Sequence, residues 1–398
     1  MKLLFCSLSS YGFVYPLIGI AQAVRSLGHE VMFVTGPEFS QTLQNENFSR
    51  IPRGGKDGES FDVKTWGFPL SVGIQIKHIE YALSMFPADM LVTTQLALGP
   101  LLVAERRRLP VAVLGLASYM WPPLWPSDFE PKSQFERRLQ WRYGDMMRHF
   151  NEARSLFGLP AVNGDCAEPP WLGDLFMIQT VPELERNEFG LPSKVHFVGS
   201  CVWEPESPDT ELSDWLEESA VAGEPVIYVQ PGRNFGFPSF WPHIREVLTG
   251  KKVRVAASLG KMTGDIGDAP DNFFVRDHLP MKMILPYSSA VITTGHTTSV
   301  LGALTHGLPS LLIACGSATE DVAERCESAG AALCFYDYER GVDTPFIEKA
   351  VDELLSNKLL KERAEKLQIA FARAGGANLV AELIEKLEVA HRKVDSRR

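Results

Sequence analysis

The sequence lacks the patterns that mark metal proteins, disulfide-stabilised secreted proteins and membrane proteins. Its six cysteines show no CxxC or CxxH spacing, and Cys6, Cys315 and Cys334 lie within or beside apolar runs, as small buried residues do. We therefore expect reduced thiols, no metal site and a cytoplasmic location. No run of ~18 apolar residues occurs, and the apolar run at the start has about five residues against the ~7–15 of a signal peptide. Neither a membrane span nor a leader is expected.

Positive charge is also scarce. The formal net charge is −10 at pH 7, which argues against general nucleic-acid binding. The hydrophobic content of 45% and the charged content of 22% are ordinary for a globular protein. A chain of 398 residues is too long for one compact core, so two domains are expected.

Apolar runs of strand length alternate with helical patterns in both halves of the chain. This alternation predicts two α/β domains, each a parallel sheet covered by helices on both faces. An acidic, proline-containing stretch at 203–222 is expected to be the interdomain linker. The predicted parts are an N-terminal domain (1–202), the linker, a C-terminal domain (223–376) and a final amphipathic helix (377–398).

The most informative stretch runs from Ala290 to Glu320 (AVITTGHTTSVLGALTHGLPSLLIACGSATE). It predicts a buried strand, a polar turn, a helix from about Thr298 that ends before Gly307, a second buried strand and another polar loop. Residues 297–299 (Thr-Thr-Ser) are expected to cap the helix. A helix N-terminus beside a Gly/Thr turn attracts phosphate, because its first N–H groups are unpaired and its dipole is positive there. The alternative is an ordinary connection between a strand and a helix.

Two other segments are candidate walls of a binding site. Residues 2–7 predict a strand, residues 9–16 a polar turn with Pro16 in the first helical turn, and residues 17–27 a helix. Ligands of such sheets gather at the carboxyl ends of the strands, where this turn lies. The second segment, Met120–Pro131, contains Trp121 and Trp125 among four prolines. It is expected to be either a wall for an apolar ligand or a packed surface loop.

Taken in order along the chain, several short motifs resemble those of the UDP-glycosyltransferase superfamily, and among its members the bacterial enzymes that glycosylate natural products. They are the Gly-Phe-Val-Tyr-Pro-Leu segment at 12–17, the Gly-His-Glu-Val segment at 28–31, the helix-and-turn pattern at 294–309 and the Thr-Glu pair at 319–320. The resemblance covers essentially the whole length. It implies a GT-B fold, in which two Rossmann-like domains face a central cleft and the last helix crosses back to the N-terminal domain.

The resemblance also implies where the substrates bind. The donor, a UDP- or dTDP-sugar, is expected on the C-terminal domain, and a small natural-product acceptor on the N-terminal domain, without a metal or a covalently bound cofactor. The implied acceptor-binding residues are Phe13, Trp121 and Trp125. The implied donor-binding residues are Gly12, Gly232, Arg233, His278, Leu279, Gly295, His296, Thr297, Thr298, Ser299, Thr319 and Glu320.

The departures from the family pattern concern chemistry. The family's catalytic histidine is replaced by Phe13, which cannot accept a proton, although such a base contributes ~10²–10⁴-fold to rate. The family's diphosphate-binding histidine is Thr294, with His296 two positions later, and the glutamate that often binds the ribose is Gly302. Ser10 and Tyr11 are the catalytic candidates nearest to the missing base.

These departures leave three hypotheses. The first is an inverting glycosyltransferase whose base lies elsewhere or is unnecessary, as for an ionised or nitrogen acceptor. The second is a non-catalytic auxiliary partner of another transferase. The third is a GT-B enzyme of different chemistry, such as an epimerase or a pseudo-glycosyl transferase. The retained anion-binding features at 294–299 favour the first and third hypotheses. A homodimer remains open.

Overall fold

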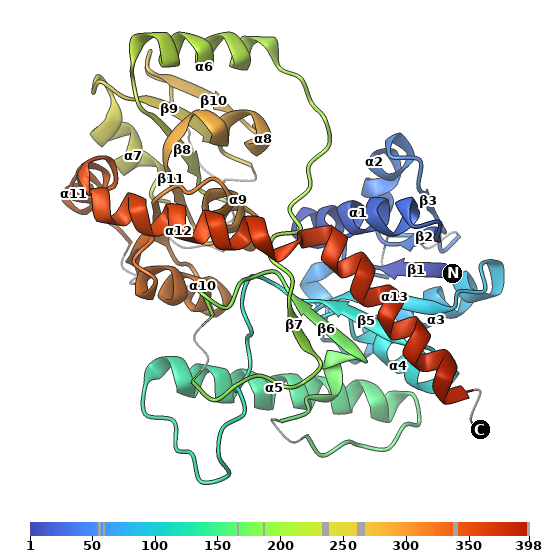
Figure 1. Ribbon diagram of the computed structural model, residues 1–398. Helices are drawn as coiled ribbons and strands as arrows, with labels where there is room; N and C mark the ends of the chain where they lie inside the picture. Colours follow the sequence, from blue (N-terminus) through green and yellow to red (C-terminus); the bar gives the residue numbers. More distant parts are fainter. Residues whose placement is uncertain are drawn as a thin grey trace. The chain divides into compact units, whose positions relative to one another are not determined.

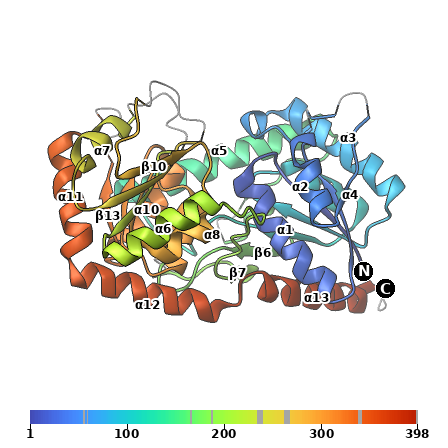
Figure 2. The same ribbon diagram turned by 90° about the horizontal axis from the view of Figure 1, so that it is seen from above.

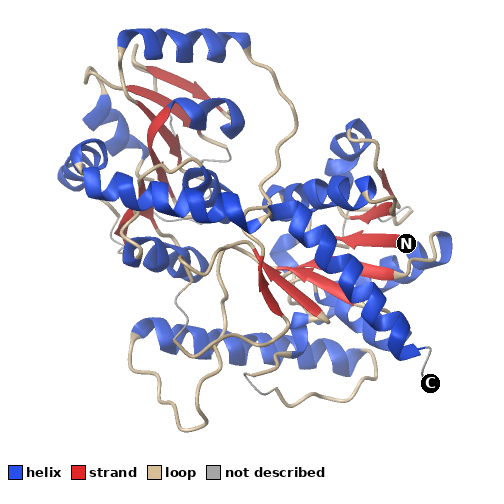
Figure 3. Ribbon diagram, in the orientation of Figure 1, coloured by secondary structure: helices blue, strands red, loops and turns tan. Residues whose placement is uncertain are grey.

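The protein is described by a computed structural model. It covers residues 1–395 except 55, 56, 59, 165, 166, 186, 187, 233–238, 261–266 and 337–340. The chain divides into two compact units. Unit 1 comprises residues 1–182, 187–203 and 374–398, and unit 2 comprises residues 183–186 and 204–373. Each unit is an α/β domain with one parallel sheet (Figure 3). The expectation of two parallel-sheet α/β domains is therefore confirmed.

Unit 1 is organised around a seven-stranded sheet in the order β3-β2-β1-β4-β5-β6-β7. All neighbouring strands run parallel, and β1 lies in register with β2 on one side and with β4 on the other. The order reverses beside β1, so the carboxyl ends of β1 and β4 flank a switch point where ligands bind in such sheets. The strands are β1 (Lys2–Cys6), β2 (Glu30–Val34), β3 (Ser49–Arg50), β4 (Met90–Thr94), β5 (Val111–Leu114), β6 (Leu175–Ile178) and β7 (Val195–Phe197).

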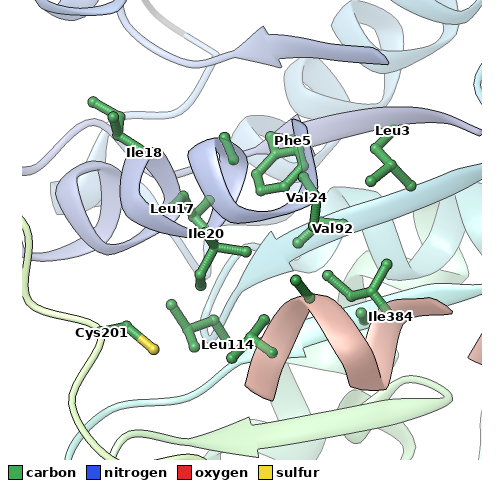
Figure 4. Close-up of a cluster of buried hydrophobic side chains, with 14 of the residues drawn as sticks. Leu3, Phe5, Leu17, Ile18, Ile20, Val24, Val92, Leu114, Cys201 and Ile384 are labelled. Carbon is green, nitrogen blue, oxygen red and sulfur yellow. The ribbon is translucent and has the colours of Figure 1, made fainter. Parts of the chain in front are cut away.

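The core of unit 1 follows from the two periodicities of the sequence. Alternate strand residues such as Leu3 and Phe5 contact an apolar helix stripe that includes Leu17 and Val24 (Figure 4). The last helix contributes Ile384 to this same cluster, and both ribbon views show α13 beside α1 (Figures 1 and 2). The helices of unit 1 are α1 (Tyr11–Ser26), α2 (Ser40–Asn45), α3 (Pro69–Met85), α4 (Leu98–Arg107), α5 (Gln134–Leu156) and α13 (Gly376–Asp395), with 3₁₀ turns η1 (Pro37–Phe39), η2 (Val63–Thr65) and η3 (Pro170–Leu172).

Unit 2 has a six-stranded parallel sheet in the order β10-β9-β8-β11-β12-β13. Here the order reverses between β8 and β11, which are paired in parallel. The strands are β8 (Val226–Gln230), β9 (Arg254–Ser258), β10 (Phe273–Arg276), β11 (Ser288–Thr293), β12 (Ser310–Ile313) and β13 (Ala332–Phe335). The helices are α6 (Thr210–Ala222), α7 (Trp241–Leu248), α8 (Met281–Ile284), α9 (Thr297–Thr305), α10 (Ser317–Ser328), α11 (Thr344–Ser356) and α12 (Lys358–Ala374), with the 3₁₀ turn η4 (Leu285–Tyr287).

The sequence-based prediction was wrong at the start of α1. This helix begins at Tyr11, so the expected turn at 9–16 is largely helical and Pro16 lies inside the helix. The amides of Phe13 and Val14 already bond the Ser10 carbonyl, which closes the first turn ahead of the proline. Because Pro16 has no N–H, the helix lacks the one hydrogen bond that residue 16 would donate to the carbonyl four residues earlier. Phe13 is therefore a first-turn helix residue.

Three helices were missing from the prediction, namely α2, α3 and α10. Residues 36–88 were expected to be irregular, yet α3 begins with Pro69 in its first turn and buries Val72, Ile76 and Ile79. That spacing of four and three residues is a helical signal that the sequence did contain. The polar loop expected after β12 is instead the start of α10, which begins at Ser317 and is polar in its first turns. The short strand β3 was also missing, whereas the other helices and strands lie within a few residues of their predicted bounds, apart from the early start of α1.

Two further findings concern the described part of the chain. No disulfide links the five cysteines described there, at positions 6, 201, 315, 326 and 334. Within the same residues, no helix combines the length and the apolar character that crossing a membrane would require.

Candidate functional site

In unit 2, three loops follow the carboxyl ends of the central strands at the switch point. They are residues 231–232 after β8, residues 294–296 between β11 and α9, and residues 314–316 between β12 and α10. Because these strands are neighbours in a parallel sheet, the loops emerge at the same edge. This is the position where ligands of open α/β sheets bind.

Gly232 lets the first loop approach the second. Its φ is +63°, a value that favours glycine. A Cβ built at Gly232 would lie 2.9 Å from Thr294 Oγ1 and 3.3 Å from His296 Nδ1. The sequence-based prediction that the 232 and 294–296 segments share one site is thus consistent with their proximity. The neighbouring Arg233 lies outside the described residues.

His296 is held by a hydrogen bond within the second loop. Its Nδ1 lies 2.7 Å from Thr294 Oγ1, and Thr294 is only 2% exposed. The Thr294 hydroxyl also bonds the Cys315 side chain, which links the second and third loops. Burial raises the pKa of the Cys315 thiol to about 11, and the bond to Thr294 partly opposes that rise. Cys315 is therefore a neutral thiol at physiological pH. When Thr294 donates to Nδ1, the imidazole carries its proton on Nε2 and can donate from that nitrogen.

The start of α9 lacks the side-chain cap that the sequence predicted. The N-cap residue is His296, and its side chain makes no capping hydrogen bond to the backbone N–H groups of the helix. The hydroxyl of Ser299 instead donates to the His296 carbonyl and bonds Thr293 Oγ1 at 2.9 Å. Ser299 thus ties the end of β11 to the start of α9. The first amides of α9 thus receive no cap from the N-cap side chain, and a helix N-terminus of this kind favours an anionic ligand.

Thr319 joins the third loop to the second. Its Oγ1 accepts a bond from the Cys315 amide at 3.0 Å and donates to the Gly316 carbonyl at 2.8 Å. Gly295 has a φ of +82°, and a Cβ there would lie 3.3 Å from Thr319 Cβ. The two loops are therefore in contact at Gly295. Glu320 follows in the first turn of α10 and is half-buried. The structure thus gathers Gly232, Thr294, Gly295, His296, Cys315 and Thr319 into one cluster.

A fourth segment of unit 2 lies between β10 and α8. His278 is exposed there, whereas Leu279 is buried and donates its backbone N–H to Ser258 Oγ at 3.2 Å. The glycine at 302 faces the start of α8, because a Cβ at that position would meet Leu285 Cδ1 at 2.9 Å and Met281 Sδ at 3.3 Å. Side chains from α8 and η4 thus occupy the space into which a glutamate at 302 would extend.

In unit 1, the candidate catalytic residues lie where β1 leads into α1. Ser10 is the N-cap residue, and its side chain makes no capping hydrogen bond. Phe13 is half-buried in the first helical turn, and Gly12 has nothing within 4 Å of an added Cβ. Asp89 lies at the amino ends of the strands, directly before β4, where its carboxylate accepts the Lys2 backbone N–H at 2.7 Å. It is therefore remote from the α1 N-terminus.

Tyr11 belongs to an aromatic cluster on α1. Its ring is 62% exposed and lies 5.1 Å from the ring of Tyr15 and 5.4 Å from that of Phe39, centroid to centroid. Tyr15 contacts Trp203 edge-on at 5.3 Å. These tilted and edge-on arrangements are the favourable ones for aromatic pairs. The phenol of Tyr11 is thus placed by packing on one side and open on the other.

The two tryptophans of the Met120–Pro131 loop have different environments. Trp121 is 1% exposed and packs against Tyr119, Trp171 and Phe176. Trp125 stacks on Phe129 at 4.5 Å with an interplanar angle of 26°. The ring of Trp121 is used in packing the domain, whereas Trp125 belongs to a surface loop.

The structure also points to residues at the carboxyl edge of the first sheet that sequence reasoning missed. Leu96 follows β4 and has a φ of +76°, a conformation that costs a non-glycine residue ~1–3 kcal/mol and often marks a functional site. The buried hydroxyl of Thr94, at the end of β4, makes no hydrogen bond within the described part of the chain. The side-chain Nε2 of Gln95 donates to Met120 Sδ at 2.9 Å. The sequence carried a signal for this edge, since polar residues directly follow a buried strand.

Two further findings concern the described residues. No group of three or more histidine, cysteine, aspartate or glutamate side chains there is arranged to hold a metal ion. A hollow of about 440 Å³ in unit 2 is lined by Gly330, Leu333, Leu360 and Arg363 among others. It lies at the amino end of β13, away from the carboxyl-edge cluster, and is not part of the site.

Comparisons with known proteins agree with this arrangement. Residues 254–387 match the family described as "Erythromycin biosynthesis protein CIII-like, C-terminal domain". The chain is 27% identical over 415 residues to 4'-demethylrebeccamycin synthase of Lentzea aerocolonigenes, covering 94% of this chain and 97% of that protein. Among solved structures, the glycosyltransferase of kitacinnamycin is similar with a TM-score of 0.75 at 17% identity, covering 97% of this chain and 98% of that one.

A second solved structure contains a nucleotide. The glycosyltransferase SsfS6 of Streptomyces sp. SF2575, complexed with thymidine diphosphate, is similar with a TM-score of 0.67 at 16% identity, covering 97% of this chain and 99% of that one. At these identities the structural likeness establishes the fold, which is GT-B. The family match over the C-terminal part of the chain, the curated relative and the shared fold together support a member of the UDP-glycosyltransferase superfamily, and they indicate a glycosyltransferase of the natural-product type.

Proposed function

We propose that this glycosyltransferase transfers a sugar, with inversion, from a UDP- or dTDP-sugar to a small natural-product acceptor whose reacting atom is nitrogen or an already ionised oxygen. The main observation that supports this donor is the convergence of three loops on the N-terminus of α9, where the N-cap side chain makes no capping hydrogen bond. The thymidine diphosphate bound by a structural relative supports a nucleoside diphosphate as the donor group.

On the donor side, the diphosphate binds at Gly295–Ser299, where the first amides of α9 and the positive end of its dipole face the anion. His296 donates from Nε2, because Thr294 occupies Nδ1. Gly232 brings a second backbone segment to the same place. The nucleobase lies at His278–Leu279, where an exposed imidazole offers a stacking face. These contacts stabilise the leaving diphosphate as the glycosidic bond breaks.

For the acceptor, the main observation is that Phe13 stands where the family has its catalytic histidine. An aliphatic hydroxyl has a pKa far above 7, so a base is needed to remove its proton during the reaction. A phenylalanine ring cannot act as that base. Asp89, which directly precedes β4, bonds the Lys2 amide at the amino ends of the strands and is therefore remote from Phe13. An acceptor that is already ionised, or a nitrogen nucleophile, does not require that assistance. Phe13 then contributes an apolar surface to the acceptor.

The test is transfer rate against pH over a panel of aliphatic alcohols, phenols and amines, for the wild type and Phe13→His. We expect the wild type to prefer amines and acidic phenols, and Phe13→His to leave those rates unchanged or lower. A large rate gain on simple alcohols in Phe13→His would contradict the proposal. It would show that the natural acceptor is an ordinary hydroxyl and that the wild type is slow because it lacks the base.

Three further variants separate base function from packing. Phe13→Leu removes the ring without adding a base, so any loss it shares with Phe13→His is a packing loss. Tyr11→Phe and Ser10→Ala each remove one hydroxyl near the missing base. Wild-type rates in both would exclude these hydroxyls as the base, whereas a loss of ~10²-fold or more in one of them would assign it.

A further inference from the structure

Glu204, the first residue of unit 2 after the chain leaves unit 1, is bound to the segment that leads into α8. Its Oε2 accepts the backbone N–H of Lys282 at 3.1 Å, and the backbone N–H of Met281 also bonds this carboxylate. The carboxylate thus satisfies two of the amides that a helix start leaves open. It is half-buried, although glutamate is ordinarily a surface residue.

The same carboxylate interacts with two groups beside the proposed nucleobase position. His278 is a favourable electrostatic neighbour of Glu204, and the negative charge of Glu204 disfavours ionisation of the buried Tyr228 phenol. Burial raises the pKa of Glu204, while the amides of Lys282 and Met281 and the charge of His278 lower it. A partly desolvated carboxylate is therefore held within the group of residues that surrounds the His278–Leu279 segment.

That segment is fixed at two points. Ser258 Oγ accepts the amide of Leu279, and Glu204 accepts the amides at 281 and 282. His278 directly precedes the first of these anchors, and its imidazole is exposed. Removing either anchor frees the segment without touching the α9 cluster, because none of the three loops there contacts Ser258 or Glu204 among the hydrogen bonds described.

We propose that Glu204 is the residue that sets the nucleobase selectivity of the donor site. This inference rests on the proposed function, since it requires a nucleoside diphosphate with its base at His278–Leu279. Glu204 acts in two ways: it positions the segment, and it adds negative charge beside the edge of the base.

The charge gives the selectivity its direction. An ionised carboxylate has about four lone-pair positions and only accepts hydrogen bonds. Two positions are used by the amides of Met281 and Lys282. A base with an N–H on its pairing edge, such as uracil, thymine or guanine, is favoured beside such a group. Adenine has a ring nitrogen that accepts hydrogen bonds at the corresponding position, so it is disfavoured beside a carboxylate. A site built to hydrogen-bond an N–H group rejects an analogue that lacks this group.

The experiment measures dissociation constants of UDP, dTDP, GDP and ADP by calorimetry for the wild type, Glu204→Ala and Glu204→Gln. We expect the wild type to bind UDP and dTDP at least tenfold more tightly than ADP, and this ratio to fall at least fivefold in Glu204→Ala. Glu204→Gln keeps an acceptor oxygen for the segment and adds an N–H₂ donor. It should retain affinity for UDP within about threefold while gaining affinity for ADP.

Asp209→Ala is the matched control. Asp209 also caps a helix of unit 2 from the same linker, since its carboxylate accepts the Leu212 amide at 3.0 Å, but it is bound to α6. An unchanged UDP/ADP ratio in Glu204→Ala, a wild type that binds ADP as tightly as UDP, or an equal change in Asp209→Ala would overturn the proposal. If the wild type bound none of the four nucleotides, the proposed function itself would fail, which is a different result from loss of selectivity.

Discussion

The hydrogen bond between Thr294 and His296 provides the sharpest test of the donor site. Thr294→Val removes the hydroxyl and keeps the branched shape, so it deletes the 2.7 Å bond to Nδ1 with little change of volume. Without that bond the imidazole loses both its preferred orientation and the partner that places its proton on Nε2. A hydrogen bond of this kind contributes about 0.5–1.5 kcal/mol net, which corresponds to roughly a 2- to 10-fold weaker binding of UDP or dTDP.

Stability should change as well. Because Thr294 is buried, Thr294→Val leaves the polar atoms of its hydrogen-bond partners unsatisfied. For fully buried groups this lowers the free energy of unfolding by about 1–3 kcal/mol. His296 is only half-buried, so the lower end of that range is expected. Calorimetric titration with UDP and dTDP at neutral pH gives the affinity, and thermal unfolding without nucleotide gives the stability.

Thr305→Val is the control on the same helix. Thr305 Oγ1 bonds the Leu301 and Gly302 carbonyls in the last turn of α9, at 2.8 and 3.0 Å, far along the helix from the N-terminus. It should affect stability and leave nucleotide affinity unchanged. If Thr294→Val bound UDP and dTDP as tightly as Thr305→Val does, His296 would not be a phosphate ligand and the reasoning would be refuted.

Three other changes have defined outcomes. Gly232→Ala should lower the unfolding free energy by about 1–2 kcal/mol and weaken UDP binding, whereas Gly223→Ala, at a similar φ of +66° but with nothing within 4 Å, should show the strain alone. Arg325→Met leaves the Glu185 carboxylate buried without its 2.5 Å ion-pair partner and should cost about 3–5 kcal/mol in denaturant unfolding, while replacing both residues by Met should recover much of that loss. Because the pKa of Glu204 is raised in the folded state, its protonated form stabilises the fold below the unfolded pKa and that contribution is lost as pH rises through the folded pKa. The unfolding temperature of the wild type relative to Glu204→Gln should therefore fall with rising pH, and a difference that stayed constant or rose would contradict this.

The sequence by itself determined the class of fold and much of the element order. Apolar runs and period-3.6 patterns specify which faces must be buried. Residues 111–114 predict a strand and residues 344–356 a helix, and the structure has β5 and α11 at these positions. Glycine and proline at 307 and 309 predicted the end of α9 for a local steric reason, and Gly307 has a φ of +62°. Local signals of this kind do not depend on distant parts of the chain.

The helix start at Tyr11 could not be predicted from the same signals. A proline normally marks the first turn of a helix, but here the first turn closes on the Ser10 carbonyl before Pro16 is reached. Similarly, residues 297–299 read locally as a cap, whereas the Ser299 hydroxyl bonds groups at 293 and 296 instead. Local propensity is a weak prior when a packed neighbour offers the same side chain another partner.

Only the tertiary structure decided which predicted site residues lie together. Gly232, His296 and Thr319 are far apart in sequence, and they meet because β8, β11 and β12 are adjacent parallel strands that end at one edge. The tertiary structure also buries Trp121 in the core, and it places Asp89 at the amino ends of the strands. Composition and spacing contain no information about strand order, and strand order is what brings loops from distant positions to the same site.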